Sequence, residues 1–245
     1  MRRRALLAAS LMTYSPDIPD EPDIDINLYM TIEALEDGVS AALSQNNIEY
    51  CINGDGNWVL LTAGTYTPSI TAGETLSFRG YLNPAMVNGI GTFTINKRCN
   101  LKGNCNSLLF GDNAASNNSL GGADYTFINL FRNCTTIKSV SANFLPATTL
   151  ANYCYYSMFY DCTSLVTAPE LPATTLASSC YYSMFQHCKS LIYIKMLATN
   201  ISATSCLNSW VWGVNSSGTF VKNAEATWDV RGSSGIPIGW TVITE

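Results

Sequence analysis

The second half of the sequence repeats itself. Residues 145–165, LPATTLANYCYYSMFYDCTSL, return as residues 171–191, LPATTLASSCYYSMFQHCKSL, at an offset of 26 residues. A fainter copy follows around Cys206, and another lies 28 residues upstream of the first around Cys134. A period of 20 to 50 residues is typical of arrays in which each unit covers the apolar face of its neighbour. We therefore expect residues 125–214 to stack as copies of one unit.

Each unit is predicted to contain a strand, a turn and a short helix. Leu165–Ala168 is a short run bounded by prolines, which suits a strand. Thr174 and Thr175 can cap the segment that follows, where apolar residues recur at helical steps of three and four. The side chains expected in the repeat core are Cys154, Met158, Phe159, Cys162, Cys180, Met184, Phe185, Cys188 and Cys206.

The pattern MF-x-x-C-x-S-L, followed by a short strand and a capped helix, resembles the BspA-like class of leucine-rich repeats. The wording TSLVTAPELPATTLA, with SGIPIGWTV near the end, is similar to proteins of gut Bacteroidales and of the crAss-like or related phages that infect them. The resemblance covers residues 125–245 well and residues 26–124 more loosely. It implies a solenoid used for binding or virion structure, and it carries no catalytic residues across.

The predicted fold class is α+β: an N-terminal antiparallel β-sandwich, then a short strand-helix leucine-rich-repeat solenoid with a β cap. Alternating strands parted by Gly and Pro favour the sandwich, and Gly54–Asn57 is a hairpin signal. The predicted domains are an anchor peptide and Pro/Asp linker (1–25), the β-sandwich (26–110), the solenoid (111–214) and the C-terminal β cap (215–245).

The first 25 residues differ from the rest in composition. Residues 1–12, MRRRALLAASLM, have the basic and apolar parts of a secretion signal but a poor cleavage site. We expect a retained anchor, with Arg2, Arg3, Arg4, Leu6 and Leu7 docking into a partner; a plain tail is the simpler reading. Residues 15–25, SPDIPDEPDID, are expected to be an extended spacer rather than a calcium site, because they lack the loop glycine and terminal glutamate of a calcium hand.

Composition excludes several classes of function. The net charge is −5 and charged residues make up only 13% of the chain, so binding to nucleic acid is not expected. No apolar run approaches the ~18 residues of a membrane span. The nine cysteines are an odd number and form no C-x2-C pair. Six of them occupy repeat positions: Cys134, Cys154, Cys162, Cys180, Cys188 and Cys206. We expect them to be reduced core thiols rather than disulfides or metal ligands, formed in a reducing cytoplasm.

No catalytic, cofactor-binding or metal-binding residues are predicted. His187 is the only histidine and replaces Asp161 of the preceding copy, so it reads as a variable surface position. No phosphate-loop, nucleophile-elbow or zinc-protease motif occurs. Positions that vary between copies are expected to be exposed, because packing fixes core volumes. The candidate binding surface is Tyr160, His187, Tyr193 and Trp212, although Trp210 and Trp212 could instead close the last unit.

These observations lead to two hypotheses of function, neither of them enzymatic. The first is a phage virion protein, a head or tail fibre assembled in the host cytoplasm. It would bind other virion proteins through its tail and a host surface glycan or protein through its repeats, and fibre proteins are commonly homo-oligomers. The alternative is a secreted adhesin on the bacterial cell surface, with residues 1–12 removed on export.

Overall fold

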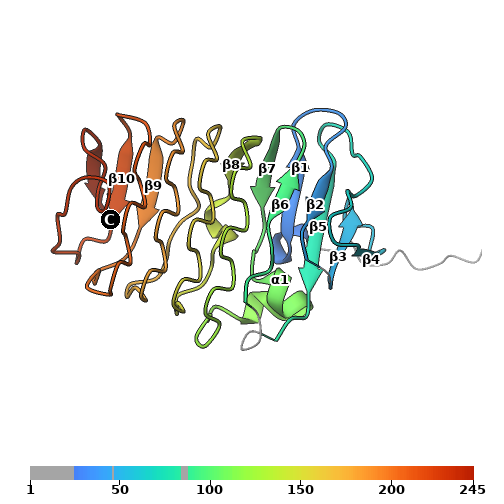
Figure 1. The fold of residues 1–245 in the computed structure, drawn as a ribbon, viewed down its shortest axis with the longest axis horizontal. Coiled ribbons are helices and arrows are strands. Elements are labelled where there is room, and N and C mark those ends of the chain that lie inside the picture. The colour runs from blue at the N-terminus through green and yellow to red at the C-terminus, as the bar shows by residue number, and fades with distance from the viewer. Residues whose placement is uncertain (1–24, 46, 84–87) are drawn as a thin grey trace, which may run out of the picture.

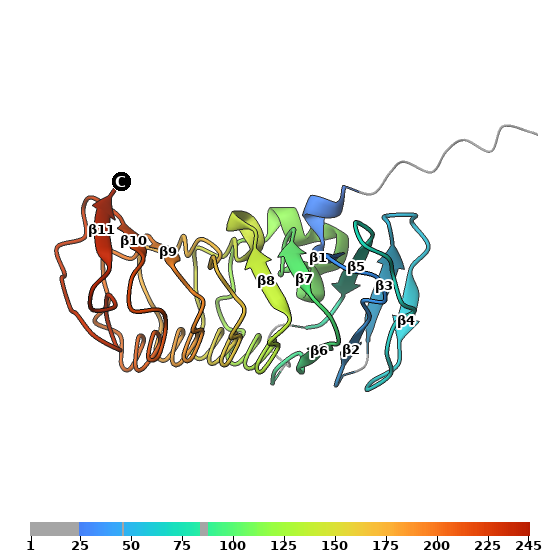
Figure 2. The same cartoon turned by 90° about the horizontal axis from the view of Figure 1, so that it is seen from above.

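The computed structural model describes residues 25–45, 47–83 and 88–245 as an elongated body. Strand β4 (Val59–Leu61) lies at one end of its long axis, and the strands before β7 (Cys99–Lys102) do not follow chain order. From β7 onward, successive segments of the chain follow one another to the other end (Figure 1). Seen from above, most of the strands lie along one long side, and stacked turns lie along the other (Figure 2). The predicted anchor residues Arg2, Arg3, Arg4, Leu6 and Leu7 lie outside the described residues.

The secondary structure consists of short strands and still shorter helices. The strands are β1 (Met30–Ala34), β2 (Ala41–Leu43), β3 (Ile48–Ile52), β4 (Val59–Leu61), β5 (Thr75–Gly80), β6 (Phe93–Ile95), β7 (Cys99–Lys102), β8 (Ile137–Val140), β9 (Tyr193–Met196), β10 (Thr219–Lys222) and β11 (Thr241–Thr244). Within residues 25–45, 47–83 and 88–245, the helices are one α-helix, α1 (Ser107–Phe110), and the 3-10 turns η1 (Ile26–Leu28), η3 (Gly111–Ser116) and η4 (Ala142–Phe144).

Three sheets organise these strands. Six strands form one sheet in the order β4-β3-β5-β1-β7-β8, in which every pair is antiparallel except β7 with β8. Strands β9, β10 and β11 form a parallel sheet, and β2 pairs with β6. Between β8 and β9, Thr167 bridges Ser139 on one side and Tyr193 on the other. The strand side is therefore continuous from the first half of the chain into the repeats.

The opposite side of each repeat is a ribbon of overlapping β-turns. Met158 N–H donates to Tyr155 O three residues back (3.2 Å), while Phe159 N–H donates to Met184 O of the next repeat (3.0 Å). The same alternation runs through the ribbons around residues 125–134, 153–162 and 179–188. Every second backbone N–H thus closes a turn, and the N–H groups between them donate to carbonyl oxygens of the neighbouring repeat. The hydrogen-bonding groups of the backbone are therefore paired without a helix or a sheet.

Each ribbon places every fourth residue in the left-handed region of backbone space. The positions are Tyr125, Asn129 and Asn133; Tyr153, Ser157 and Asp161; Ser179, Ser183 and His187; and Ser205, Ser209 and Gly213, with φ between 51° and 76°. A positive φ at the third residue of a turn is what a type II turn requires. Asn and Asp tolerate it better than most residues, and only glycine is unstrained there.

The predicted fold class is therefore wrong. No α-helix occurs in residues 125–214, whose predicted helices are turn ribbons, and the described residues contain only the short α1. Leu165–Ala168 is not a full strand either, since only Thr167 bridges. Nor do the N-terminal strands form a separate antiparallel sandwich, because β7 pairs with β8 of the repeat region. The domain boundaries stay a prediction, and one apolar core extends from Met30 to Trp240.

That core is built from columns of like side chains. One column of rings runs Phe93, Phe131, Phe159, Phe185, with centroids 5.4–5.7 Å apart. The thiols of Cys134, Cys162 and Cys188 each donate to a carbonyl oxygen far back in the chain, at 3.0–3.1 Å. All nine cysteines are buried and free, including the six predicted repeat positions. Equivalent residues of successive repeats are in contact because the ribbons are stacked in register.

The strained backbone geometry of the ribbons can be tested at Asn133, which is exposed at a φ of 65°. We expect Asn133→Val to lower the free energy of unfolding by about 1–2 kcal/mol, because a β-branched side chain crowds the following carbonyl in the left-handed region, which asparagine tolerates better. Asn133→Gly should change it by less than about 0.5 kcal/mol. Urea unfolding midpoints measure both. Thr135→Val, at an exposed position without positive φ, is the control; equal losses at 133 and 135 would contradict the turn assignment.

The buried thiols should make the fold sensitive to alkali. Burial raises the pKa of Cys51 to about 11 and those of Cys134 and Cys180 to about 12. An unfolded thiol ionises near pH 8.5, so the unfolded chain loses protons first. The stability that the folded state gains from its protonated thiols is fully present below about pH 8.5. It is lost as the pH rises toward the pKa of the thiols in the folded state.

We expect the free energy of unfolding to fall from about pH 8 to about pH 9.5, with each thiol contributing at most about 1.4 kcal/mol per pH unit. Tyrosines ionise higher, near pH 10, so this interval reports on thiols. Urea melts in reducing buffer supply the measurement. A free energy that stays constant over the interval would mean that the thiols titrate alike in both states.

Candidate functional site

A line of rings and one cation crosses the outer surface of four successive ribbons. The Arg132 guanidinium lies 3.9 Å from the Tyr160 ring centroid. The Tyr160 and His187 ring centroids are 5.4 Å apart, and those of His187 and Trp212 are also 5.4 Å apart. We call Arg132, Tyr160, His187 and Trp212 the ring ladder. It ends at Trp212, which is 56% exposed.

The middle of the ring ladder is held in place by Asp161 and Gly213. An Asp161 carboxylate oxygen lies 3.3 Å from His187 Nδ1, and the contact becomes an ion pair when the imidazole is protonated. Gly213, at a φ of 76°, leaves room for the ring: a Cβ there would lie 2.9 Å from His187 Cδ2. Gln186 turns inward and is 8% exposed, so His187 fills the space between Tyr160 and Trp212. The imidazole is thus fixed by packing on both sides and by one polar contact.

A second line of rings runs beside the first. Tyr125 stacks on Tyr153 with centroids 4.6 Å apart, Tyr153 lies 6.1 Å from Tyr156, and Tyr156 stacks on Tyr182 at 4.7 Å. We call these four residues the tyrosine ladder. The pKa of Tyr156 is raised, mainly by partial burial and then by Tyr182, and the charge of Arg132 opposes this rise. Arg132, a member of the ring ladder, is therefore also close to the tyrosine ladder. The two ladders together form one surface, which we call the outer ribbon face.

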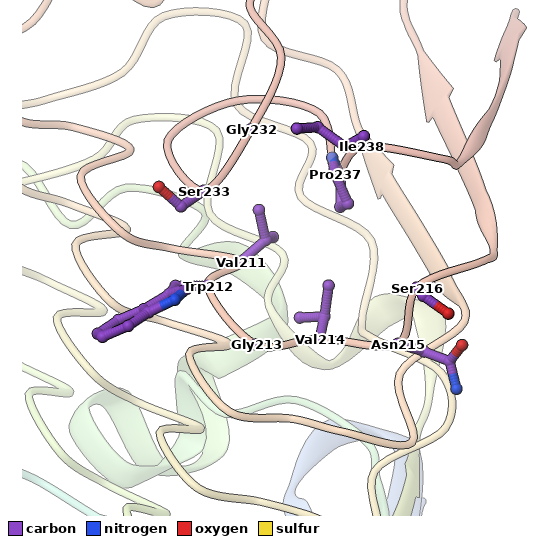
Figure 3. Close-up of a pocket in the computed structure, with 10 residues that line it drawn as sticks. All are labelled: Val211, Trp212, Gly213, Val214, Asn215, Ser216, Gly232, Ser233, Pro237 and Ile238. Carbon is purple, nitrogen blue, oxygen red and sulfur yellow. The ribbon is translucent and has the colours of Figure 1, made fainter.

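A shallow pocket of about 200 Å³ adjoins the last ring of the ladder (Figure 3). Its lining comes from the last ribbon and from the loop ahead of β11: Val211, Trp212, Gly213, Val214, Asn215, Ser216, Gly232, Ser233, Pro237 and Ile238. Figure 3 shows the side chains of Val211 and Val214 pointing into the space below Pro237. The lining is mainly apolar and includes the hydroxyl-bearing Ser216 and Ser233 and the amide-bearing Asn215.

The structure brings together three of the four predicted surface residues. Tyr160, His187 and Trp212 are members of the ring ladder, whereas Tyr193 lies half-buried in β9 on the strand side. The predicted core residues Cys154, Met158, Phe159, Cys162, Cys180, Met184, Phe185, Cys188 and Cys206 are at most 3% exposed. Trp210 is fully buried and donates its indole N–H to Gly235 O (2.8 Å) at the end of the stack.

Sequence reasoning missed Arg132 and the tyrosine ladder. Tyr156 and Tyr182 occupy the same position in two copies, and identity between copies was taken to mark the core, yet both are half-exposed. The signal that could have found them is their place next to Ser157 and Ser183, residues that suit a turn rather than a helix. Arg132 lies in the faint upstream copy, where the alignment of repeats is weakest.

Rigid, partly exposed aromatic rings interleaved with polar groups are suited to binding by contact and hydrogen bonding. Within the described part of the chain, no three His, Cys, Asp or Glu side chains are grouped to hold a metal ion. None of the helices described there is long and apolar enough to cross a bilayer. Comparisons with protein-family models, curated proteins and solved structures found no match to this chain.

The fit between Gly213 and His187 gives a prediction with a direct readout. Gly213→Ala should displace the imidazole, since the new Cβ would overlap Cδ2, whereas Gly122→Ala has nothing within 4 Å at a similar φ of 81°. Both variants carry about 1–2 kcal/mol of backbone strain. Because the chain has one histidine, its imidazole proton resonances are identified without assignment. Only Gly213→Ala should shift them; equal shifts in both variants would contradict the packing.

Proposed function

We propose that this chain is a non-enzymatic binding protein of a phage particle, and that it contacts the host surface through the outer ribbon face. The observation that carries the proposal is the ring ladder ending in the exposed indole of Trp212. Aromatic side chains provide large contact areas with little rotational freedom to lose, which makes them frequent hot spots of binding. The tyrosine ladder widens the same surface.

The ladders have the rigidity that a binding surface needs. Each ring rests on a ring or guanidinium of the adjacent repeat, and each repeat is joined to the next by main-chain hydrogen bonds such as Asp161 N–H to Gln186 O (2.9 Å). Little ordering is therefore required when a partner binds, and the cost of binding is correspondingly low.

One expectation and two observations support a place on a virion. The expectation comes from the repeat motif of residues 125–245, which we compared above with proteins of gut Bacteroidales phages; no comparison with known proteins matches this chain, and the strand-helix fold implied by the resemblance is not found. All nine thiols are free and buried, which suits assembly in a reducing cytoplasm. Residues 1–25 supply a basic, apolar segment and a Pro-rich spacer with which to join other virion proteins, and a homo-oligomer remains part of the proposal.

The function can be tested by attachment to host cells. Fluorescently labelled full-length chain is added to a panel of gut Bacteroidales strains, and bound protein is measured by flow cytometry. We expect Trp212→Ala to weaken attachment at least tenfold, about 1.4 kcal/mol, as the loss of a hot-spot ring does. Tyr66→Ala is the matched control, because Tyr66 is 51% exposed and belongs to neither ladder.

Two outcomes would contradict the proposal. The first is equal attachment by wild type, Trp212→Ala and Tyr66→Ala, which would remove the outer ribbon face from the interaction. The second concerns the particle: mass spectrometry of purified phage from infected cultures should detect the chain with residues 1–12 intact. Detection on uninfected bacteria, with those residues missing, would establish the secreted adhesin instead.

A further inference from the structure

We propose that the pocket beside Trp212 binds one terminal, uncharged pyranose ring of a host surface glycan. The inference rests on the proposed function and makes it more specific, because it names the ligand class and the end of the ladder where recognition takes place. It follows from three features of the structure: the unoccupied side of the last ring, the absence of charge in the pocket lining, and the fixed position of the walls.

Among the described residues, Trp212 is the ring of the ladder with a ring partner on one side only. Tyr160 lies between Arg132 of the preceding repeat and His187 of the following one. His187 in turn lies between Tyr160 and Trp212. Trp212 has a ring on the His187 side, and it lines the pocket that closes the stack. A ring-shaped ligand in this pocket would become the next member of the series.

The chemistry of the lining selects an uncharged ligand. None of its ten residues carries an ionisable side chain, and the nearby Arg231 is paired with Asp229 at 2.9 Å. Val211, Val214, Pro237 and Ile238 offer apolar contact, and Ser216 and Ser233 add hydroxyl-bearing side chains to the lining. A pyranose has the matching pattern of a C–H face bounded by hydroxyl groups. A small apolar pocket with a few polar groups is the usual form of a small-ligand site.

The volume limits the ligand to one ring. About 200 Å³ is less than the ~300–1,000 Å³ of pockets that hold drug-sized molecules. The part of the glycan that does not enter the pocket would extend into solvent or along the exposed indole of Trp212. The site therefore suits the end of a glycan rather than an internal stretch.

The walls of the pocket are fixed before any ligand arrives. Val211 N–H donates to Ser233 O (3.2 Å), and the Trp240 indole N–H donates to Asn215 O (2.8 Å). Gly239 passes so close to Ser216 O that a Cβ would lie 2.7 Å from it. On the other side of Trp212, the contact of Asp161 with His187 holds the ring that supports the indole. Such a preformed site needs little ordering on binding.

The test uses nuclear magnetic resonance of the ¹⁵N-labelled full-length chain. The indole N–H of Trp212 is identified by its loss in Trp212→Phe, and the probes are methyl pyranosides of glucose, galactose, mannose, fucose and N-acetylglucosamine. Methyl glucuronide and N-acetylneuraminic acid are the charged comparators. We expect at least one uncharged pyranoside to shift the Trp212 signal with a dissociation constant on the order of 1 mM, the affinity of a very small ligand.

Two exposed serines provide a matched pair of variants. Ser233→Leu places a bulky side chain in the pocket and should abolish the shift. Ser202→Leu adds the same side chain at an exposed position outside the pocket and should leave the shift unchanged. His187→Ala should weaken binding severalfold, and His187→Phe should restore it, because the role assigned to the imidazole is support of the indole.

The outcomes separate this inference from the proposed function. If no pyranoside shifts the Trp212 signal, or if the charged sugars bind more tightly, the inference is overturned. It is also overturned if cell attachment requires Trp212 but survives periodate oxidation of the cell-surface sugars, which would indicate a protein partner while the proposed function stands. Pyranoside binding that Ser233→Leu removes, without any attachment to host cells, would support the pocket and refute the proposed function.

Discussion

Backbone N–H groups in each turn ribbon alternate between two kinds of partner, and the other features of the repeats depend on this alternation. Tyr156 N–H closes a turn onto Tyr153 O (3.2 Å), and Tyr155 N–H reaches Cys180 O in the next repeat (3.0 Å). Because every second residue is bonded across, neighbouring ribbons are held in register. Equivalent side chains then lie above one another, which is why rings stack on rings and thiols occupy columns. The same constraint orders the buried core and the outer ribbon face.

The period and the buried set could be predicted from the sequence, but the local conformation could not. Cys154 and Met158 are four residues apart and both buried, a spacing that an α-helix and a turn ribbon share. The hydrophobic spacing therefore predicted correctly which residues are buried, but it predicted the wrong backbone conformation. The discriminating signal was weaker: Asn129 and Asn133 lie four residues apart, Asp161 takes the place of Asn133 in the next copy, and such residues tolerate a positive φ. Tyr125 and Tyr153 adopt the same conformation against their own preference, so tertiary packing decides it.

The candidate site was partly predictable for a different reason. Tyr160, His187 and Trp212 were found because they vary between copies, and variation is tolerated where side chains reach solvent. The contact of these three side chains with one another could not be predicted from the sequence. Tyr160 and Trp212 occupy equivalent positions in their repeats, whereas His187 lies one position later in its own repeat. The contact depends on Gln186 turning inward and on Gly213 leaving room. The pocket was beyond prediction because residues 232–238 had to fold back onto residues 211–216.

The ring ladder gives the molecule two unlike ends. At one end, the guanidinium of Arg132 on the first ribbon covers a face of Tyr160 on the second, and its charge lowers the pKa of Tyr156 in the tyrosine ladder. At the last repeat Ser233 O and Ser234 Oγ accept from Val211 N–H and Ser209 N–H, so residues 233–234 complete the main-chain pattern without adding another ring. At this end of the stack the backbone N–H groups of the last ribbon are thus paired, but residues 233–234 place no further ring on Trp212. Trp212 is left with a supported side and a free side, which is why the proposed recognition is placed at that one end.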